Sequence, residues 1–257
     1  MRTVGLSFFD TVPVHEYRRV VHPRAGEVHL NCLEFAANRA PVLRLLDWLS
    51  AEDRQRAASF RLDACRERFV LSHAYARAVL ANYIGVHPQR VPLRTDLLGR
   101  PVIAVGGVGG SQTIGFSLSH CDTHAAIAVA ATVLVGVDIE GCRPGVDGVG
   151  IARRYLAREE ANALAGLSPE EAQKRFARLW TCKEAFVKAI GLGLFYPLDR
   201  FVVGGVGRSA PELISVAPEY GAPSTWSLRT DVLADGSYVS TAVKYADAVV
   251  LRRFGFP

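Results

Sequence analysis

Three side chains able to take part in chemistry recur at four-residue steps in Leu179-Trp-Thr-Cys-Lys-Glu-Ala-Phe-Val-Lys-Ala-Ile-Gly-Leu-Gly-Leu194. The segment has the pattern of a helix that ends at glycines, so Trp180, Glu184 and Lys188 lie on one face of it. A glutamate four residues before a lysine is also common on exposed helix surfaces, where it stabilises a helix by only about 0.2–0.5 kcal/mol. The rest of the chain must decide between chemistry and helix stability.

A predicted strand supplies two more carboxylates in Val133-Leu-Val-Gly-Val-Asp-Ile-Glu140. Because strand side chains alternate between faces, Asp138 and Glu140 point the same way, about 7 Å apart, beside the open surface of Gly136. Two like charges this close repel each other unless a cation lies between them. Mg²⁺ suits such a place, since it takes hard oxygen ligands from carboxylates and phosphates. A strand end running into solvent would carry the same residues, and this alternative stays open. The opposite face, expected in a core, holds Val133, Val135, Val137 and Ile139.

The helix face offers a third carboxylate and a cation. A core stripe is expected on the side opposite Trp180, and a large Trp facing away from the core needs another surface to cover it, such as a ligand or a cleft. Glu184 could join the same ion, and Lys188 could stabilise developing phosphate charge. The predicted core stripe consists of Leu179, Cys182, Phe186 and Ile190.

The composition limits the class of protein. The 257 residues are 49% hydrophobic and 21% charged, which predicts a globular chain with ample core. No apolar run is long enough to cross a membrane, and the five scattered cysteines suggest neither zinc nor a disulfide framework. We therefore expect a cytoplasmic enzyme or binding protein. The net charge of +5 indicates an anionic partner, but without a basic block nucleic-acid binding is not expected.

Two halves of the chain resemble each other. Ser50 opens a short helix, a long helix is predicted over Asp63–Ile84, a further helix over residues 150–166, and another long one from Ser168-Pro-Glu-Glu171 to Gly191. The long helices end at Ile84-Gly85 and Ile190-Gly191, 106 residues apart, so that Arg77 matches Lys183. Trp48-Leu-Ser-Ala-Glu-Asp53 also echoes Tyr155-Leu-Ala-Arg-Glu-Glu160. Any two amphipathic helices look alike, but the matching segment before each helix favours duplication.

The remaining segments predict strands. They cover residues 113–119, 125–131, 132–140, 201–206 and 213–216, and residues 226–245 with a hairpin turn at Asp235-Gly236. The glycine-rich residues 104–112 predict a loop. Together these elements predict an α/β (α+β) fold of two similar halves related by a pseudo-twofold axis. We place the halves at 1–131 and 132–257, with the active site between them.

The first half lacks the polar trio, since Ala74, Ala78 and Asn82 match Trp180, Glu184 and Lys188. A trio that served only helix stability would be expected in both copies. The asymmetry therefore favours one active site, with the second copy specialised for it.

Val135-Gly-Val-Asp-Ile-Glu140 followed by Trp180-Thr-Cys-Lys-Glu-Ala-Phe-Val-Lys188 resembles the two-part signature of the 4′-phosphopantetheinyl transferases. The duplicated single chain resembles the Sfp-type members, and the resemblance runs over residues 48–203. Leu98-Gly-Arg-Pro101 and Phe116-Ser-Leu-Ser-His120 also resemble family motifs. The family transfers the 4′-phosphopantetheine arm of coenzyme A to a serine of an acyl or peptidyl carrier protein and releases 3′,5′-ADP.

The resemblance also implies residue roles. Asp138, Glu140 and Glu184 would hold Mg²⁺, with Mn²⁺ possible, and Glu184, directly or through water, would take the serine proton. Lys188 would stabilise the charge that develops during transfer. The adenosine 3′-phosphate region would be bound by Ser119, His120, Arg100 and, on a looser match, Arg56. Lys183 and Lys188 would also bind coenzyme A, and Lys183 and Trp180 would shape the site. Asp53 stands where a lysine would be expected, which weakens the match around Arg56. A monomer in the cytoplasm, working with coenzyme A and a carrier protein, is the expected form.

Other interpretations of these residues remain. A non-catalytic module that binds coenzyme A or a carrier protein would keep the pocket, although the intact set of three carboxylates and Lys188 argues against it. His120 and His124 could ligate a metal, or His120 and Cys121 could form a nucleophilic pair, but the predicted turn between strands suits neither arrangement. His73, inside the long helix, is expected to be a packed or surface histidine.

Overall fold

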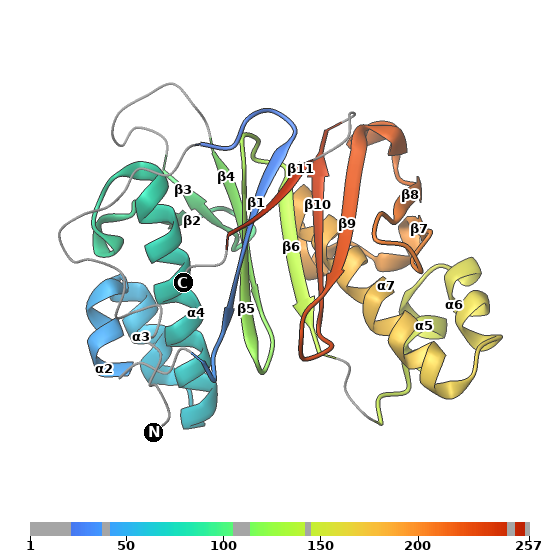
Figure 1. Ribbon diagram of the computed structural model, residues 1–257, viewed down its shortest axis with the longest axis horizontal. Coiled ribbons are helices and arrows are strands. Elements are labelled where there is room, and N and C mark those ends of the chain that lie inside the picture. Colours follow the sequence, from blue (N-terminus) through green and yellow to red (C-terminus); the bar gives the residue numbers. More distant parts are fainter. Residues whose placement is uncertain (1–21, 38–41, 105–113, 142–144, 246–249, 255–257) are drawn as a thin grey trace.

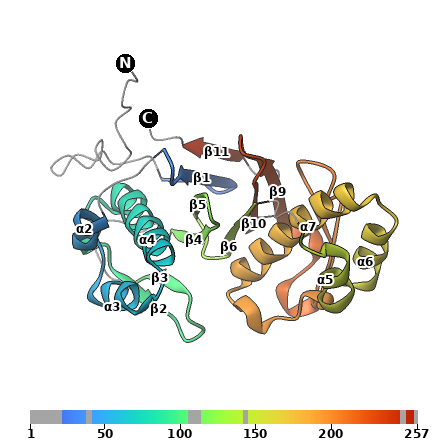
Figure 2. The same ribbon diagram turned by 90° about the horizontal axis from the view of Figure 1, so that it is seen from below.

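A computed structural model describes residues 22–37, 42–104, 114–141, 145–245 and 250–254. Two sheets lie at the centre and helices cover them from both outer sides (Figure 1). Seen at right angles, the two longest helices, α4 and α7, lie on opposite flanks of the strands (Figure 2). The predicted mixed α/β architecture is confirmed.

The first unit holds the long helix α4 and a four-stranded sheet of order β11-β1-β5-β4. Strands β1 and β5 are antiparallel, as are β4 and β5, whereas β11 joins β1 in parallel from the far end of the chain. The elements of this unit are β1 (Glu27–Glu34), α2 (Val42–Leu45), α3 (Ala51–Ser59), α4 (Asp63–Ile84), β2 (Leu93–Thr95), β3 (Pro101–Ile103), β4 (Gly115–His120), β5 (His124–Ala130) and β11 (Val250–Phe254).

The second unit repeats this topology. Its sheet has the order β6-β10-β9, so a first strand pairs with the second strand of a later hairpin in both units. The hairpin turn at Asp235-Gly236 is confirmed, with Gly236 at φ +84°. The elements are β6 (Val135–Glu140), α5 (Gly148–Tyr155), α6 (Arg158–Ala165), α7 (Pro169–Ile190), β7 (Val202–Gly204), β8 (Glu212–Ser215), β9 (Trp226–Val232) and β10 (Tyr238–Lys244).

Local sequence signals explain where the helices begin and end. Ser50 Oγ accepts a hydrogen bond from Asp53 N at 3.0 Å and caps α3, and Ser168 caps α7 in the same way. Helices α4 and α7 are both 22 residues long. They end at Gly85 and Gly191 in the left-handed region, which a residue without a side chain adopts at little cost.

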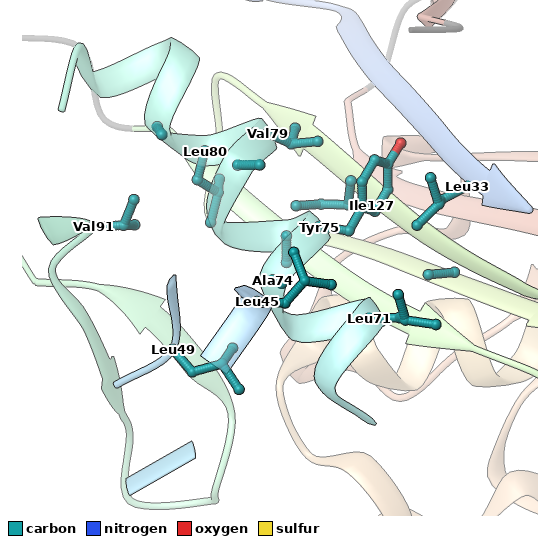
Figure 3. Packing of buried hydrophobic residues seen from close by; sticks show 14 of the residues in the cluster. Leu33, Leu45, Leu49, Leu71, Ala74, Tyr75, Val79, Leu80, Val91 and Ile127 are labelled. Atoms are coloured by element: carbon teal, nitrogen blue, oxygen red, sulfur yellow. The ribbon is translucent and has the colours of Figure 1, made fainter. Parts of the chain in front are cut away.

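Three apolar clusters fill the layers. One lies between α4 and the first sheet, where Leu71, Ala74 and Tyr75 of the helix meet Leu33 and Ile127 of the strands (Figure 3). A second lies between α7 and the second sheet, and a third between the two sheets. Strand β5 is buried along its whole length because it lies between two clusters. Its Ile127 and Val129 face α4, and its small Ala126 and Ala128 face the other sheet.

Several predicted elements differ from the structure. The helix expected over residues 150–166 is two helices, since the chain is extended at Leu156 and at Ala157, which precedes the first residue of α6. Strand β6 starts at Val135, and Val133, expected in the core, is 52% exposed. Strands β1 and β11 were not predicted. The predicted loop at 104–112 lies outside the described residues except for Ala104. The boundary between 1–131 and 132–257 stays a prediction, although β11 joins the first sheet.

Gly136 sets how closely α7 approaches β6. A Cβ on Gly136 would lie 1.9 Å from Ala185 O and 2.6 Å from Ala189 N, both in the backbone of α7. The helix therefore packs directly on the backbone of the strand that carries Asp138. The open surface predicted beside Asp138 is the contact surface for the helix.

Gly136→Ala should destabilise the fold by about 3 kcal/mol or more, because neither backbone can move without disturbing the core. Urea unfolding would measure the loss. Gly166→Ala is the matched control, since a Cβ there meets nothing within 4 Å. Equal stability of the two variants would contradict the close packing.

Candidate active site

The two units meet where β4 runs beside β6. Val137 N donates a hydrogen bond to Ser117 Oγ at 3.1 Å, which joins the two strands. Two residues further along β4, Ser119 Oγ donates to Asp138 Oδ1 at 2.8 Å. One polar residue from each unit therefore meets at the junction of the sheets.

Lys188 completes this contact from α7. Its ammonium Nζ donates to Ser119 Oγ at 2.8 Å and to Asp138 Oδ1 at 2.6 Å. The close approach at Gly136 places the last turns of α7 over β6, so that Lys188 reaches Asp138. Three predicted site residues, separated in sequence by up to 69 positions, thus form one hydrogen-bonded cluster.

The acidic residues carry more negative charge than this lysine balances. Asp138 is 5% exposed, and its second oxygen, Oδ2, is buried without a hydrogen-bond partner. Burial raises the pKa of Glu184, and the charges of Asp138 and Glu140 raise it further against the opposing charge of Lys188. An unpartnered carboxylate oxygen beside mutually repelling carboxylates fits a divalent cation with oxygen ligands.

The acidic side chains are not arranged as a complete metal site in this structure. Within the described ranges, no group of three or more His, Cys, Asp or Glu side chains is placed to hold a metal ion. Asp138 Oδ1 instead accepts hydrogen bonds from Lys188 and Ser119. The residues thus have the chemistry of a cation site, with Lys188 beside the central carboxylate.

Trp180 lies between two cavities. One, of about 290 Å³, is lined by Glu140, Val146 and Phe176, and the other, of about 380 Å³, by Glu184 and Tyr155. The Trp180 ring packs on Phe176 with centroids 5.7 Å apart. Trp180, which was expected to face a ligand or a cleft, therefore lines two cavities. Each cavity is also lined by one of the acidic residues.

Arg100 lies on the other side of Lys188. Both residues line a cavity of about 210 Å³ together with Leu98, Phe116 and Gly191. Arg100 Nη2 donates to Val133 O at 2.5 Å, and burial lowers the pKa of its guanidinium, against the effect of Asp96. Arg100 and Lys188, which were both predicted to belong to the site, therefore face the same cavity.

His120 stands in a group of cations. Desolvation, together with the positive charges of His73, Lys188, Arg68 and Arg56, lowers its pKa to about 4, although the residue keeps an exposed surface. Arg56 Cζ lies 5.3 Å from the ring centroid of Phe69, and the His73 ring stacks on the same ring at 3.9 Å. The predicted Arg56 and His120 are therefore brought together.

Sequence reasoning missed two members of this cation group. Arg68 was not considered, and His73 was expected to be packed or at the surface. His73 is partly exposed and lies 3.2 Å from Asp53 through Nδ1 and Oδ1. The only signal in the sequence was a basic residue and a histidine on the face of α4 toward α3.

The structure does not bring Lys183 into the site. Its side chain is 0% exposed, and Nζ donates to Glu160 Oε1 and to Phe201 O, both at 2.7 Å. Burial lowers the pKa of Lys183, and the charge of Glu160 opposes this. Lys183 ties α7 to α6 and to the segment before β7.

The first unit holds a matching contact. Arg77, the residue that matches Lys183, is 3% exposed and donates to Asp53 Oδ2 at 3.4 Å and to the backbone oxygens of Pro88 and Val91. Asp53 and Glu160 are both the third residue of a short helix that precedes a long one. The duplication seen in the sequence therefore extends to an ion pair in each unit, fully buried at Lys183–Glu160 and partly buried at Arg77–Asp53.

Comparison with known proteins identifies the family. The family model for the 4′-phosphopantetheinyl transferase superfamily matches residues 134–243. The 4′-phosphopantetheinyl transferase HetI of Nostoc sp. strain PCC 7120 is 31% identical over 219 residues, 85% of this chain and 88% of the relative. A 4′-phosphopantetheinyl transferase of Bacillus subtilis, named ffp, is 30% identical over 66% of this chain and 74% of its own. In Mus musculus, the L-aminoadipate-semialdehyde dehydrogenase-phosphopantetheinyl transferase is 25% identical over 84% of this chain and 74% of its own.

The chain belongs to the 4′-phosphopantetheinyl transferase superfamily. It is thus an enzyme of the transferase class, and the resemblance carried by its two motifs is confirmed. No helix in the described part of the chain is long and apolar enough to cross a membrane.

Lys183→Ala should destabilise the protein by about 3–5 kcal/mol, because the buried Glu160 loses its charge partner. Thermal or urea unfolding would measure the loss. Lys174→Ala removes an exposed pair with Glu170 on the same helix and should change stability little. A mild effect of Lys183→Ala on stability with a selective loss of coenzyme A binding would instead support the ligand role first predicted for Lys183.

Proposed function

We propose that the chain transfers the 4′-phosphopantetheine arm of coenzyme A to a serine of an acyl or peptidyl carrier protein, with Mg²⁺, and releases 3′,5′-ADP. The observation that carries the proposal is the cluster of Asp138, Ser119 and Lys188, with Glu184 held nearby at a raised pKa. The cluster combines carboxylates for a cation with a lysine for a phosphate.

The cation would be held by Asp138, Glu140 and Glu184. Asp138 Oδ2 is the buried oxygen that lacks a partner, and Asp138 and Glu140 both raise the pKa of Glu184. When bound, Mg²⁺ would neutralise charge on the pyrophosphate of coenzyme A and make 3′,5′-ADP a better leaving group. Removing the ion should leave the three carboxylates repelling one another.

The transfer needs a base and an aligned nucleophile. Glu184 would take the proton of the carrier serine, since its raised pKa makes it a stronger base than an ordinary carboxylate. The serine oxygen then forms a bond to the β-phosphorus, and the bond from that phosphorus to the oxygen of 3′,5′-ADP breaks. Lys188 would stabilise the charge that builds on the phosphate oxygens, after exchanging its contact with Asp138 for the substrate.

The remaining basic residues would bind coenzyme A. Arg100 lines a cavity with Lys188 and can hold the nucleotide end near the transfer site. Ser119 would hydrogen-bond to coenzyme A beside Lys188, and Arg56, in the cation group around His120, would suit the 3′-phosphate. The net charge of +5 complements carrier proteins, which are usually acidic near their serine. We place the enzyme in the cytoplasm as a monomer; the described cysteines form no disulfides, which suits a reducing compartment.

Asp138→Asn and Glu184→Gln should each lower the transfer rate by at least about 10²–10³, because each removes a charge at the reacting phosphates. Mass spectrometry of apo-carrier proteins mixed with enzyme, coenzyme A and Mg²⁺ would measure modification. Glu170→Gln, at the exposed start of the same helix, is the matched control and should transfer normally.

Near-normal turnover by Asp138→Asn would refute the assignment of Asp138. Chelation of divalent ions should stop the wild type, and added Mg²⁺ or Mn²⁺ should restore it. A protein that binds apo-carrier in chelator but never modifies any carrier would be a non-catalytic binding module, and the proposed function would then be wrong.

A further inference from the structure

A second polar contact between the units lies at the turn that follows β4. Thr123 Oγ1 donates a hydrogen bond to Asp235 Oδ2 at 3.0 Å, and His124 Nδ1 lies 3.3 Å from the same oxygen. Thr123 and His124 belong to the first unit, whereas Asp235 lies in the turn between β9 and β10 of the second unit. Figure 1 shows the two turns next to each other at the lower end of the sheets. We call Thr123, His124 and Asp235 the turn cluster.

Each side of the turn cluster is held in place by its own unit. Asp235 Oδ1 accepts a hydrogen bond from Ser237 N at 3.0 Å, and Oδ2 accepts one from Ser237 Oγ at 2.9 Å. In the first unit, Cys121 N donates to His124 O at 2.9 Å and closes the turn between β4 and β5. The His124 side chain is itself buried. The turn cluster is therefore a contact between two turns whose own hydrogen bonds fix their shapes.

The turn cluster is also a contact between charges. The hydrogen bond with Cys121 raises the pKa of His124 against the effect of burial, and the charge of Asp235 raises it further. Partial burial acts to raise the pKa of Asp235, but its hydrogen bonds with Ser237 and Thr123 hold it below its usual range. Both shifts favour the charged forms, and a hydrogen bond between charged groups is stronger than one between neutral groups.

The two turns lie beside the strand ends that carry the site. Ser119 is the last residue but one of β4, just before the first turn. On the other side, Tyr238 at the start of β10 pairs with Glu140 at the end of β6. A Cβ on Gly141 would lie 3.7 Å from Ser237 Oγ, so the second turn contacts the end of β6. The turn cluster thus joins the end of β4, with Ser119, to the end of β6, with Glu140.

The two units contribute different parts of the proposed site. The carboxylates proposed for the cation, Asp138, Glu140 and Glu184, all lie in the second unit. Ser119, proposed to bind coenzyme A beside Lys188, lies in the first unit. The cation can therefore be held within one unit, whereas coenzyme A must be bound by both. The relative position of the units thus affects the affinity for the nucleotide more than the affinity for the ion.

We propose that Asp235 is a positioning residue for coenzyme A, because through Thr123 and His124 it fixes the end of β4, and with it Ser119, against the second unit. The inference rests on the proposed function for its substrate. Asp235 is not among the proposed ligands, so it acts through the two residues that it holds. Lys188 would release Asp138 when the phosphate binds, so the contact of Lys188 does not hold the units throughout the reaction. The turn cluster can stay in place during binding and transfer.

The test replaces each side of the turn cluster by a residue of similar shape. Asp235→Asn removes the charge but keeps a hairpin turn, since Asn-Gly suits such turns, and Thr123→Val removes the hydroxyl. Each variant should raise the KM for coenzyme A about tenfold, because a hydrogen bond to a charged group is lost and Ser119 is no longer fixed. Steady-state kinetics with an apo-carrier protein should show kcat nearly unchanged. The Mg²⁺ concentration for half-maximal activity at saturating coenzyme A should also stay the same.

The controls distinguish positioning from a loss of stability. Thr225→Val removes a hydroxyl that donates to Ala222 O within its own turn, and it should keep the KM of the wild type. The double variant of Thr123 and Asp235 should resemble either single variant, because both changes remove the same contact. A fall in kcat alone, as fewer folded molecules would give, or an unchanged KM overturns the proposal. An equal rise in the Mg²⁺ requirement, or effects on KM that multiply in the double variant, would also contradict it.

Calorimetric binding of coenzyme A separates this inference from the proposed function. A wild type that modifies no carrier, yet binds coenzyme A about tenfold more weakly after either Asp235→Asn or Thr123→Val, would support the positioning role and refute the transfer. A wild type that modifies carriers, while both variants bind coenzyme A as the wild type does, would refute the positioning role and leave the transfer in place.

Discussion

The ammonium of Lys188, shared between Asp138 and Ser119, is the contact on which the site depends. It joins the last turns of α7 to a strand of each unit, so any movement of the units changes the site directly. The contact exists only because Gly136 lets α7 pack against the backbone of β6. The Lys188 ammonium also balances part of the negative charge of the acidic residues. In the proposed function, the phosphate and its cation would bind beside it.

The duplicated architecture explains why the site is one-sided. Each unit keeps a buried cation on its long helix, paired with the third residue of the preceding short helix: Arg77 with Asp53, and Lys183 with Glu160. These pairs fasten helices to one another. The two long helices differ in their other polar residues. Helix α7 carries Glu184 and Lys188 at the junction of the units, whereas α4 carries His73 and Arg68. The second unit thus supplies the acidic residues and Lys188, whereas the first supplies the basic residues around α3 and α4.

The predictions succeeded where the signal was local. The bounds of α4 and the end of α7 follow from helical spacing and a terminal glycine. Asp138, Glu184 and Lys188 were expected to lie together because strand and helix periodicity place each on a known face, and Lys188 does contact Asp138. Predictions failed where partners distant in sequence decide: β1 and β11 are stabilised by pairing, and residues 150–166 divide at Ala157. Lys183 was expected near coenzyme A, but its face of α7 packs against α6, where it pairs with Glu160. The residues around Lys183 in the sequence do not indicate that contact.

By itself the sequence determined the two long helices, the duplication, the two motifs and the family, because each depends on residue type and spacing along the chain. Only the tertiary structure decided which side chains meet. It placed Ser119 against Asp138 and buried Lys183 on Glu160. It also paired Asp53, which stands where a lysine was expected, with His73. The physical reason is that hydrogen bonds and charge interactions act over a few ångströms. They therefore depend on how α3, α4, α7 and the two sheets pack, which no single segment encodes.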